Sequence, residues 1–239
     1  MQAVVIERPG EAVFTEVETP VPGPDDVLVR SLAAGVCRTD LEILEGRLSE
    51  RWVRFPCIPG HEWSGTVAEV GGGVTDLAPR ERVVCEGMIP CNACRRCKAG
   101  ETQLCERYDQ LGFTRGGGYG EHVLVPRRVV HRLPEHVSLD AAVLVEPASC
   151  VLRALERTRP EPGDAIGVIG DLAVIGSCSY TAGAWTRVLR LLESRLVDFD
   201  PIVTHRFPAR GFEQAFALLG ARQGLVAKVL LEHSPAGDT

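Results

Sequence analysis

Gly60-His61-Glu62-Trp63-Ser64-Gly65 is the stretch that decides the fold of this 239-residue chain. It joins an imidazole to a carboxylate, follows a proline-containing approach, and leads into a segment with the pattern of a β-strand. Gly65 and Gly71 fit a strand whose neighbours approach closely, because a glycine leaves room for another backbone. Histidine and carboxylate side chains are both zinc ligands. The stretch therefore predicts half of a metal site at the start of a strand.

The other half of this metal site is predicted from two distant residues. Cys37 follows a strand-like segment, and Glu146 precedes a proline at the expected start of a helix. One thiolate, one imidazole and one carboxylate, with a fourth position left open, form a plausible ligand set for a catalytic zinc. The ordinary alternatives are a small core residue for Cys37 and an acid favoured by the helix dipole for Glu146.

Four cysteines form a second and more local signal. Their spacing is C-x2-C-x2-C-x7-C in a polar, turn-rich segment, at Cys91, Cys94, Cys97 and Cys105. Four thiolates can close a tetrahedral structural zinc site, and a lobe of this composition would take much of its order from the metal. Reduced surface cysteines, disulfides and an iron–sulfur cluster are the alternatives.

These three features together carry a resemblance. The Gly-His-Glu motif at 60–62, Cys37 after a predicted strand, and the four-cysteine spacing resemble the medium-chain, zinc-dependent alcohol and polyol dehydrogenases, such as sorbitol, threonine and glucose dehydrogenases. The resemblance implies a GroES-like catalytic barrel with a structural-zinc lobe, zinc at a catalytic and a structural site, and NAD or NADP. The implied substrate is a small secondary alcohol, namely a polyol, sugar, cyclitol or amino alcohol.

The resemblance also implies roles for individual residues. Cys37 and His61 would be zinc ligands, with Glu62 or Glu146 as the carboxylate ligand. Thr39 would be the hydroxyl that relays the substrate proton, so Thr39 and Glu62 are the predicted catalytic residues. A further match is Arg206, at a position that contacts the cofactor phosphate in some relatives, although it is otherwise a surface arginine.

Composition narrows the classes of protein and partner. The formal net charge is −6 and there is no basic block, so we expect no nucleic-acid partner. No export signal and no apolar run near the roughly 18 residues of a membrane span are found, so we expect a cytoplasmic protein without a membrane partner. Only two lysines occur, Lys98 and Lys228, which argues against Schiff-base chemistry.

The first part of the chain shows short strand patterns separated by Gly and Pro, which are typical of a barrel. The predicted strands are Ala3–Ile6, Val13–Val17, Val27–Ala33, Gly65–Val70, Arg82–Cys85, Glu121–Val125 and Val129–Leu133. Helix signals begin at Glu146. The fold class is therefore predicted as α+β, mainly β.

The region after residue 160 departs from the family pattern. Residues 165–169 read like the first strand of a dinucleotide domain, but the G-x-G-x-x-G turn and the later ribose-binding acid are absent. A second strand-like segment follows at 172–175, and a helix is expected over Ala184–Arg195. On the order of 100 residues of doubly wound sheet are missing, judged from what such a domain needs.

The predicted domain organisation follows from this gap. Residues 1–160 form the catalytic domain with its zinc lobe at about 85–110, 161–199 form a truncated Rossmann remnant, and 200–239 return to the catalytic domain. That return consists of a strand at 203–207, a helix at 212–219 and a strand at 226–231.

Two functions from different classes follow. The first is a zinc-dependent alcohol dehydrogenase impaired by loss of its cofactor domain, with weak or absent cofactor binding. The second is an isolated zinc-binding domain or pseudoenzyme without hydride transfer, or a catalyst of cofactor-independent zinc chemistry. Strand edges that have lost their neighbours also suggest self-association into a homo-oligomer.

Overall fold

The computed structural model describes residues 1–158, 179–221 and 225–233. The two predicted strands at 165–169 and 172–175 lie outside the described residues. None of the helices in the described part is long and apolar enough to cross a membrane.

The long strand β3 (Asp26–Val36) organises the main sheet. Strand β4 (Trp63–Val70) pairs along one of its edges. The opposite edge is shared by two strands, with β6 (His122–Pro126) on residues 26–30 and β9 (Lys228–Glu232) on residues 33–36. The C-terminal strand is thus an integral part of the sheet built by the N-terminal half.

The sheet has seven strands in the order β7-β5-β4-β3-β9-β8, with β6 paired to β3 off this path. The remaining members are β5 (Arg82–Cys85), β7 (Val130–Arg132) and β8 (Val203–Pro208). Strands β8 and β9 are parallel, with the helix α6 in the connection between them. A separate antiparallel ribbon is formed by β1 (Gln2–Arg8) and β2 (Glu11–Glu16).

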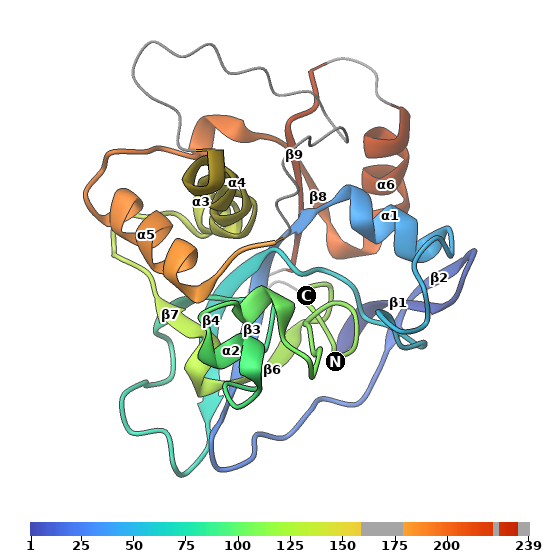
Figure 1. Ribbon diagram of the computed structural model, residues 1–239. Helices are drawn as coiled ribbons and strands as arrows, with labels where there is room; N and C mark the ends of the chain where they lie inside the picture. Colours follow the sequence, from blue (N-terminus) through green and yellow to red (C-terminus); the bar gives the residue numbers. More distant parts are fainter. Residues whose placement is uncertain (159–178, 222–224, 234–239) are drawn as a thin grey trace.

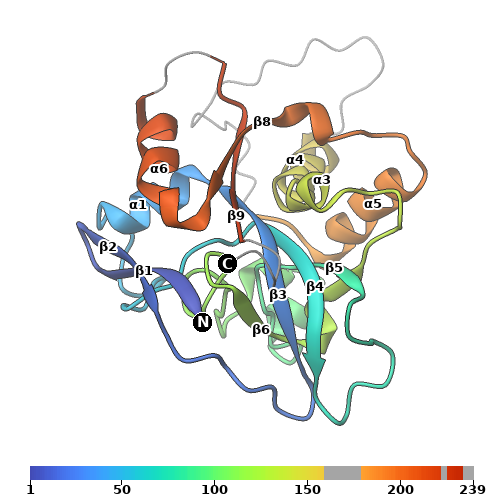
Figure 2. The same cartoon turned by 180° about the vertical axis from the view of Figure 1, so that it is seen from behind.

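Six α-helices and four short 3-10 helices are found among the described residues. The α-helices are α1 (Arg38–Leu44), α2 (Arg95–Lys98), α3 (Leu139–Val143), α4 (Val145–Thr158), α5 (Ala182–Glu193) and α6 (Phe212–Ala221). The 3-10 helices are η1 (Thr102–Leu104), η2 (Arg127–Val129), η3 (Asp200–Ile202) and η4 (Ala209–Gly211). Both views show α3, α4 and α5 on one side of β9, and α1 with α6 on the other (Figures 1 and 2).

Within the described ranges, four apolar clusters hold these elements together, and two of them are large. The larger core lies on the sheet and includes Val27, Val29 and Trp63, which are almost fully buried. The second core lies between the sheet and α3, α4 and α5, and it is centred on Tyr180 and Trp185. The rings of these two residues lie 5.0 Å apart. The second core fixes α5 against the region that carries the candidate metal ligands.

The structure confirms the predicted α+β, mainly β class. All seven strands predicted in the first part are present, with ends shifted by a few residues. Gly65 packs as predicted, because a Cβ there would lie 1.9 Å from the Arg30 carbonyl oxygen. The sheet is not a closed barrel over the described residues, since β7 and β8 are its two edges. The short helices α1 and α3 were not predicted.

Tyr180 joins the segment before α5 to the loop that leads into the cysteine lobe. Its hydroxyl accepts hydrogen bonds from the backbone N–H of Gly87, at 2.8 Å, and of Met88, at 3.3 Å. Replacing Tyr180 by phenylalanine is expected to lower the free energy of unfolding by about 1–3 kcal/mol, because it leaves two buried amides without an acceptor. Urea denaturation measures this.

The matched control is Tyr108→Phe, which removes a hydroxyl that donates to the Gln110 side chain in a partly buried site. It should lower the free energy of unfolding by less than the Tyr180 substitution does. If the two substitutions lowered it equally, the hydrogen bonds of Tyr180 to the Gly87 loop would not stabilise the fold more than an ordinary surface contact.

Candidate metal centres

Cys37 lies at the junction of β3 and α1 and acts as the N-cap of that helix. Its backbone N–H donates to Asp40 Oδ2 at 2.9 Å. Asp40 is fully buried and also accepts hydrogen bonds from the hydroxyl of Tyr119, at 2.9 Å, and the N–H of Gly60, at 3.4 Å. Asp40 thereby ties the loop of Cys37 to the loop of His61, although 20 residues separate Asp40 from Gly60.

The loop that carries His61 is held by a glycine-rich segment. The N–H of Gly118 donates to the carbonyl of Gly60 at 2.7 Å, and a Cβ at Gly117 would lie 2.4 Å from the same oxygen. Only glycine therefore allows this close approach. Gly60 itself has a φ of +92°, in the region that favours glycine. The glycines at 116–118 therefore position the loop of His61. They lead into the strand β6 and not into a helix, so they do not form a phosphate site at a helix N-terminus.

His61 is buried, with one ring nitrogen turned toward a carboxylate. Its Nδ1 lies 3.6 Å from Asp40 Oδ1 and has no hydrogen-bond partner among the described atoms. Burial lowers the pKa of His61, but the neighbouring side chains of Asp40 and Cys37 raise it well above its usual value. A histidine that ligates zinc commonly points its other nitrogen at a carboxylate, so the pair His61 and Asp40 fits a metal ligand and its support.

The candidate ligand atoms of Cys37, His61 and Glu62 all lie within 4.8 Å of one another. This group comes from the end of β3 and the loop before β4, which pair as neighbours in the sheet. Soft thiolate, imidazole and carboxylate donors in one compact group suit zinc. The residues that the sequence singled out from two separate segments are thus brought together.

Glu62 has a partner that the sequence did not predict. Lys228 of β9 donates its Nζ to Glu62 Oε2, and both residues are buried. Burial lowers the pKa of Lys228, but the charge and hydrogen bond of Glu62 raise it above its usual value. The pair is therefore a buried ion pair that neutralises Glu62. The only indication of this ion pair in the sequence is Lys228 itself, which stands at the start of a mainly apolar strand.

Replacing Lys228 by methionine is expected to lower the free energy of unfolding by about 3 kcal/mol or more, because it leaves Glu62 as a buried charge without its partner. The measurement is urea unfolding of the metal-free protein. Lys98→Met, at the other and exposed lysine, is the matched control and should change stability little. If the two variants unfolded alike, the ion pair would not be a structural determinant.

Glu146 lies in the first turn of α4 and is 8% exposed. Burial raises its pKa to about 7, and nearby charges of Glu62 and Asp40 add to the rise while those of His61 and Lys228 oppose it. Glu146 therefore faces the same cluster. It is not part of the compact group of three ligands. Its role as the carboxylate ligand stays a prediction.

Two further predicted site residues lie at different distances from this cluster. Thr39 belongs to α1, and its Oγ1 is 3.6 Å from Cys37 Sγ. Arg206 lies on β8, where it donates to Asp140 Oδ2 at 2.8 Å and lies 3.5 Å from Glu232. A cofactor phosphate at Arg206 would compete with both carboxylates. Its cofactor role stays a prediction.

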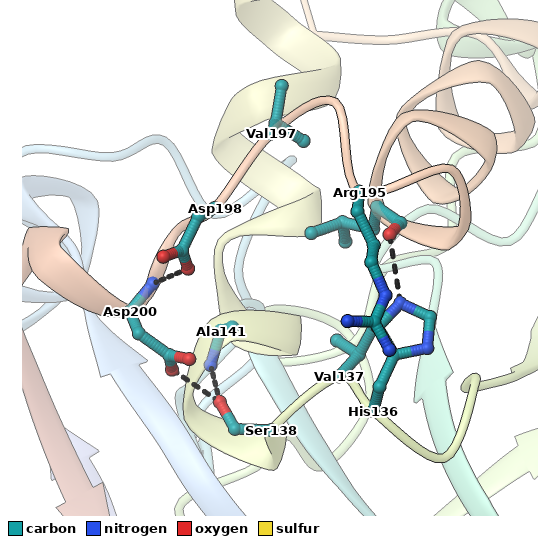
Figure 3. Close-up of a pocket in the computed structure, with 9 residues that line it drawn as sticks. His136, Val137, Ser138, Ala141, Arg195, Val197, Asp198 and Asp200 are labelled. Carbon is teal, nitrogen blue, oxygen red and sulfur yellow. Dashed lines mark hydrogen bonds between the residues drawn. The ribbon is translucent and has the colours of Figure 1, made fainter.

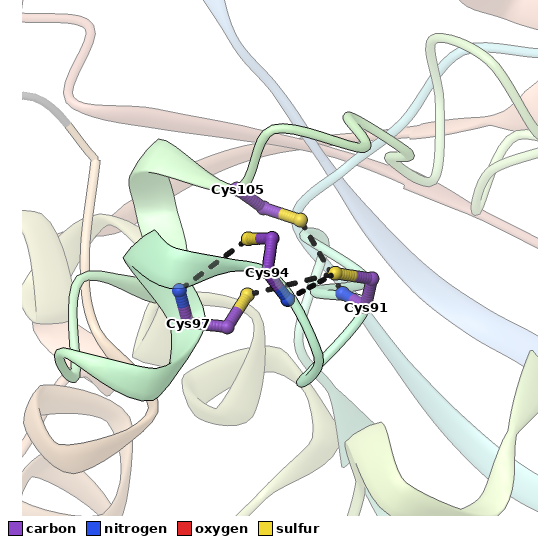
Figure 4. Close-up of side chains that lie close together, drawn as sticks. All are labelled: Cys91, Cys94, Cys97 and Cys105. Carbon is purple, nitrogen blue, oxygen red and sulfur yellow. Dashed lines mark hydrogen bonds between the residues drawn. The ribbon is translucent and has the colours of Figure 1, made fainter.

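The four cysteines of the lobe converge, as Figure 4 shows. Their sulfur atoms all lie within 4.8 Å of one another. The N–H of Cys94 points to Cys91 Sγ at 3.3 Å, and the N–H of Cys97 points to Cys94 Sγ at 3.5 Å. Backbone hydrogen bonds, first from Cys97, lower the pKa of Cys94 to about 6. This is a set of preoriented thiolates suited to a closed four-coordinate metal.

The disulfide alternative finds no support among the described cysteines. No disulfide joins any of them, and the Sγ atoms of Cys91 and Cys97 in the lobe are 4.0 Å apart. A disulfide needs about 2.05 Å. The spacing of the sulfurs therefore favours metal coordination over cross-linking.

A surface pocket of about 290 Å³ lies away from both groups, between the start of α3 and the end of α5 (Figure 3). Ser138 donates to Asp200 at 2.5 Å across it, and His136 lies 3.2 Å from the Leu192 carbonyl oxygen. None of its lining residues belongs to either candidate metal group. It lies between α3 and the end of α5 and is separate from both candidate metal groups.

Comparison with known proteins finds a matching domain family and similar dehydrogenases. Residues 23–135 match the alcohol dehydrogenase GroES-like domain. The chain is 35% identical over 170 residues to D-arabinitol dehydrogenase 1 of Uromyces fabae, a match that covers 71% of this chain and 48% of that protein. It is 37% identical over 150 residues to an L-threonine 3-dehydrogenase of Rhizobium etli, covering 62% and 43%.

A solved structure agrees in fold. The cobalt- and zinc-bound thermostable alcohol dehydrogenase of Pyrobaculum aerophilum superposes with a TM-score of 0.85 at 21% identity, over 97% of this chain and 99% of that one. The fold is that of this dehydrogenase. The chain carries the alcohol dehydrogenase GroES-like domain at residues 23–135, and it is similar in sequence to polyol and threonine dehydrogenases. It spans about half the length of the curated relatives that it matches.

Proposed function

We propose that this chain is a zinc-dependent oxidoreductase for a small secondary alcohol, with hydride transfer impaired by a shortened cofactor domain. The substrate class is a polyol, sugar, cyclitol or amino alcohol. The proposal rests on the compact group of Cys37, His61 and Glu62, whose ligand atoms lie within 4.8 Å of one another, with His61 and Glu62 buried. The matched relatives include an arabinitol and a threonine dehydrogenase, which supports this substrate class.

The residues present fit a catalytic zinc ion. Cys37, His61 and one carboxylate would hold it, and it would supply a Lewis acid that polarises an alcohol or carbonyl oxygen. Asp40 orients the His61 ring, and Lys228 neutralises the charge of the buried Glu62 carboxylate. Glu146, with its pKa raised to about 7, is the second carboxylate able to enter the ligand set or to exchange a proton near neutral pH.

Thr39 is the proposed proton carrier. Its hydroxyl lies beside Cys37, at 3.6 Å, and its residue is only partly buried. A hydroxyl can both accept and donate a proton in hydrogen bonds, so it can pass the proton of a substrate alcohol outward. Removal of that hydroxyl in a Thr39→Val variant removes the donor and acceptor while keeping the shape of the side chain.

Two observations support the proposal of a shortened cofactor domain. A match of 170 residues is 48% of the arabinitol dehydrogenase, which makes that relative about 350 residues long against 239 here. Finally, a groove of about 410 Å³ between α4 and α5 is lined by apolar side chains. On α4, Val151 is 59% exposed, as expected of a helix that has lost a covering element.

The proposed domain limits follow the same reasoning. Residues 1–160 form the catalytic domain, with the lobe at about 85–110, and 161–199 are the shortened cofactor part. The last part, 200–239, returns to the catalytic domain, which is supported by the pairing of β9 with β3. The alternative function is a zinc domain without hydride transfer, or cofactor-independent zinc chemistry. This alternative is favoured by the ion pairs of Arg206 with Asp140 and Glu232, because they leave this arginine less able to bind a cofactor phosphate.

Zinc content tests the proposed metal centres. We expect about two zinc ions per chain in protein purified without chelators, because two separate ligand groups are present. A Cys37→Ser variant should keep about one. Elemental analysis that returned no zinc, iron in its place, or two zinc ions in the Cys37 variant would overturn the assignment.

A further inference from the structure

A cationic pocket of about 340 Å³ lies beside the cysteine lobe and is independent of the proposed catalytic site. Four arginines from four separate segments line it: Arg54, Arg107, Arg115 and Arg128. A single carboxylate, Asp109, shares the lining with them. The pocket thus carries an excess of three positive charges in a chain whose formal net charge is −6.

The one carboxylate of the pocket, that of Asp109, already accepts two hydrogen bonds within the protein. Asp109 Oδ2 accepts from Arg115 Nε at 2.7 Å, and its Oδ1 accepts from the Thr114 hydroxyl at 2.7 Å. The other three arginines form no ion pair with any of the residues that the structure describes. Their charges therefore converge on the pocket without a counter-charge from the described part of the protein.

Two of these arginines are held by hydrogen bonds beside the pocket. Arg54 donates its backbone N–H to the Phe113 carbonyl at 3.1 Å and follows the buried Val53. Arg128 donates from its guanidinium to the Pro90 carbonyl at 3.2 Å. Arg54 is thus fixed at its backbone and Arg128 at its side chain, and both stay in place to contact an anion in the pocket.

We propose that this pocket binds a small oxyanion with two or more phosphate groups. A guanidinium matches a phosphate with two parallel hydrogen bonds, and several of them together match more than one phosphate. The volume suits a small molecule, since ligand pockets start at about 300 Å³. A nucleic acid would need an extended basic surface, which the net negative charge of the chain does not provide.

The site shares a wall with the lobe, because Cys91 lines the pocket. A structural explanation for the arginines is therefore that they offset the negative charge of four thiolates around a metal. That explanation predicts that loss of an arginine would reduce metal retention. The binding proposal predicts that it would reduce only the affinity for the anion.

The test is isothermal titration of the zinc-loaded protein with inorganic pyrophosphate at near-physiological salt. We expect saturable binding, weakened about tenfold by Arg54→Gln and by Arg128→Gln, because each removes a charge-assisted contact worth at least 1.4 kcal/mol. Arg210→Gln removes an exposed arginine of η4, outside the pocket and without an ion pair among the described residues, and should leave the affinity unchanged.

Zinc content is measured before and after each titration, because pyrophosphate itself binds metals. Retained zinc with weakened binding in both pocket variants supports the site. Three results would overturn it: no saturable binding, equal weakening by Arg210→Gln, or loss of zinc from the Arg54 and Arg128 variants.

Discussion

A Cys94→Ser variant is expected to lose one zinc ion and to melt roughly 10 °C lower than the unaltered protein. The reason lies in the lobe itself. Helices α2 and η1 contain no buried residue, so apolar packing contributes little to their order. Metal coordination would supply most of the free energy that folds this segment. Differential scanning calorimetry with elemental analysis measures both effects.

Cys150→Ser is the matched control, because Cys150 lies on α4 outside both candidate metal groups. It should keep both zinc ions and nearly the full melting temperature. A second comparison is His61→Asn, which should lose the other zinc ion with a smaller loss of stability. If the Cys94 and His61 variants behaved alike, the division into a structural and a catalytic site would be wrong.

The zinc-loaded chain is expected to reduce NAD or NADP at least about a thousandfold more slowly than a full-length family member. Hydride transfer needs the nicotinamide carbon held against the carbinol carbon of the substrate, and the protein contributes this by binding the cofactor. The sequence lacks the complete glycine turn and the ribose acid of that domain. Arg206 is already paired with Asp140 and Glu232.

Stopped-flow measurement of cofactor reduction with polyols, sugars and amino alcohols tests this expectation. The His61→Asn variant gives the background rate, and isothermal titration with NAD and NADP gives the affinities. Micromolar cofactor binding together with substrate-dependent reduction would contradict the proposed impairment and restore an ordinary dehydrogenase.

The cysteine lobe and the strands could be predicted because their signals are local. The four cysteines fall within 15 residues, and each strand shows its own pattern of apolar residues and bounding glycines. The ligands of the catalytic group could be proposed from their chemistry and from the resemblance, although Cys37 and His61 lie on separate segments. Their approach depends on Asp40, which the sequence analysis did not single out.

Long-range partners were beyond sequence reasoning. Lys228 reaches Glu62 across 166 residues because β9 pairs with β3, and that pairing requires the complete sheet. The helices α1 and α3 have seven and five residues, too short for a periodic pattern. The openness of the sheet likewise depends on which strands are its edges, a property that no single strand encodes.

Anomalous X-ray diffraction at the zinc absorption edge would locate both proposed metal ions in the protein. We expect two peaks per chain, one among Cys91, Cys94, Cys97 and Cys105 and one in contact with Cys37 and His61. The second peak should lie near 2 Å from an oxygen of Glu62 or Glu146. A distance above about 5 Å from Glu146 would remove that residue from the ligand set. A single peak, or none beside Cys37 and His61, would show that the chain does not hold the proposed catalytic zinc.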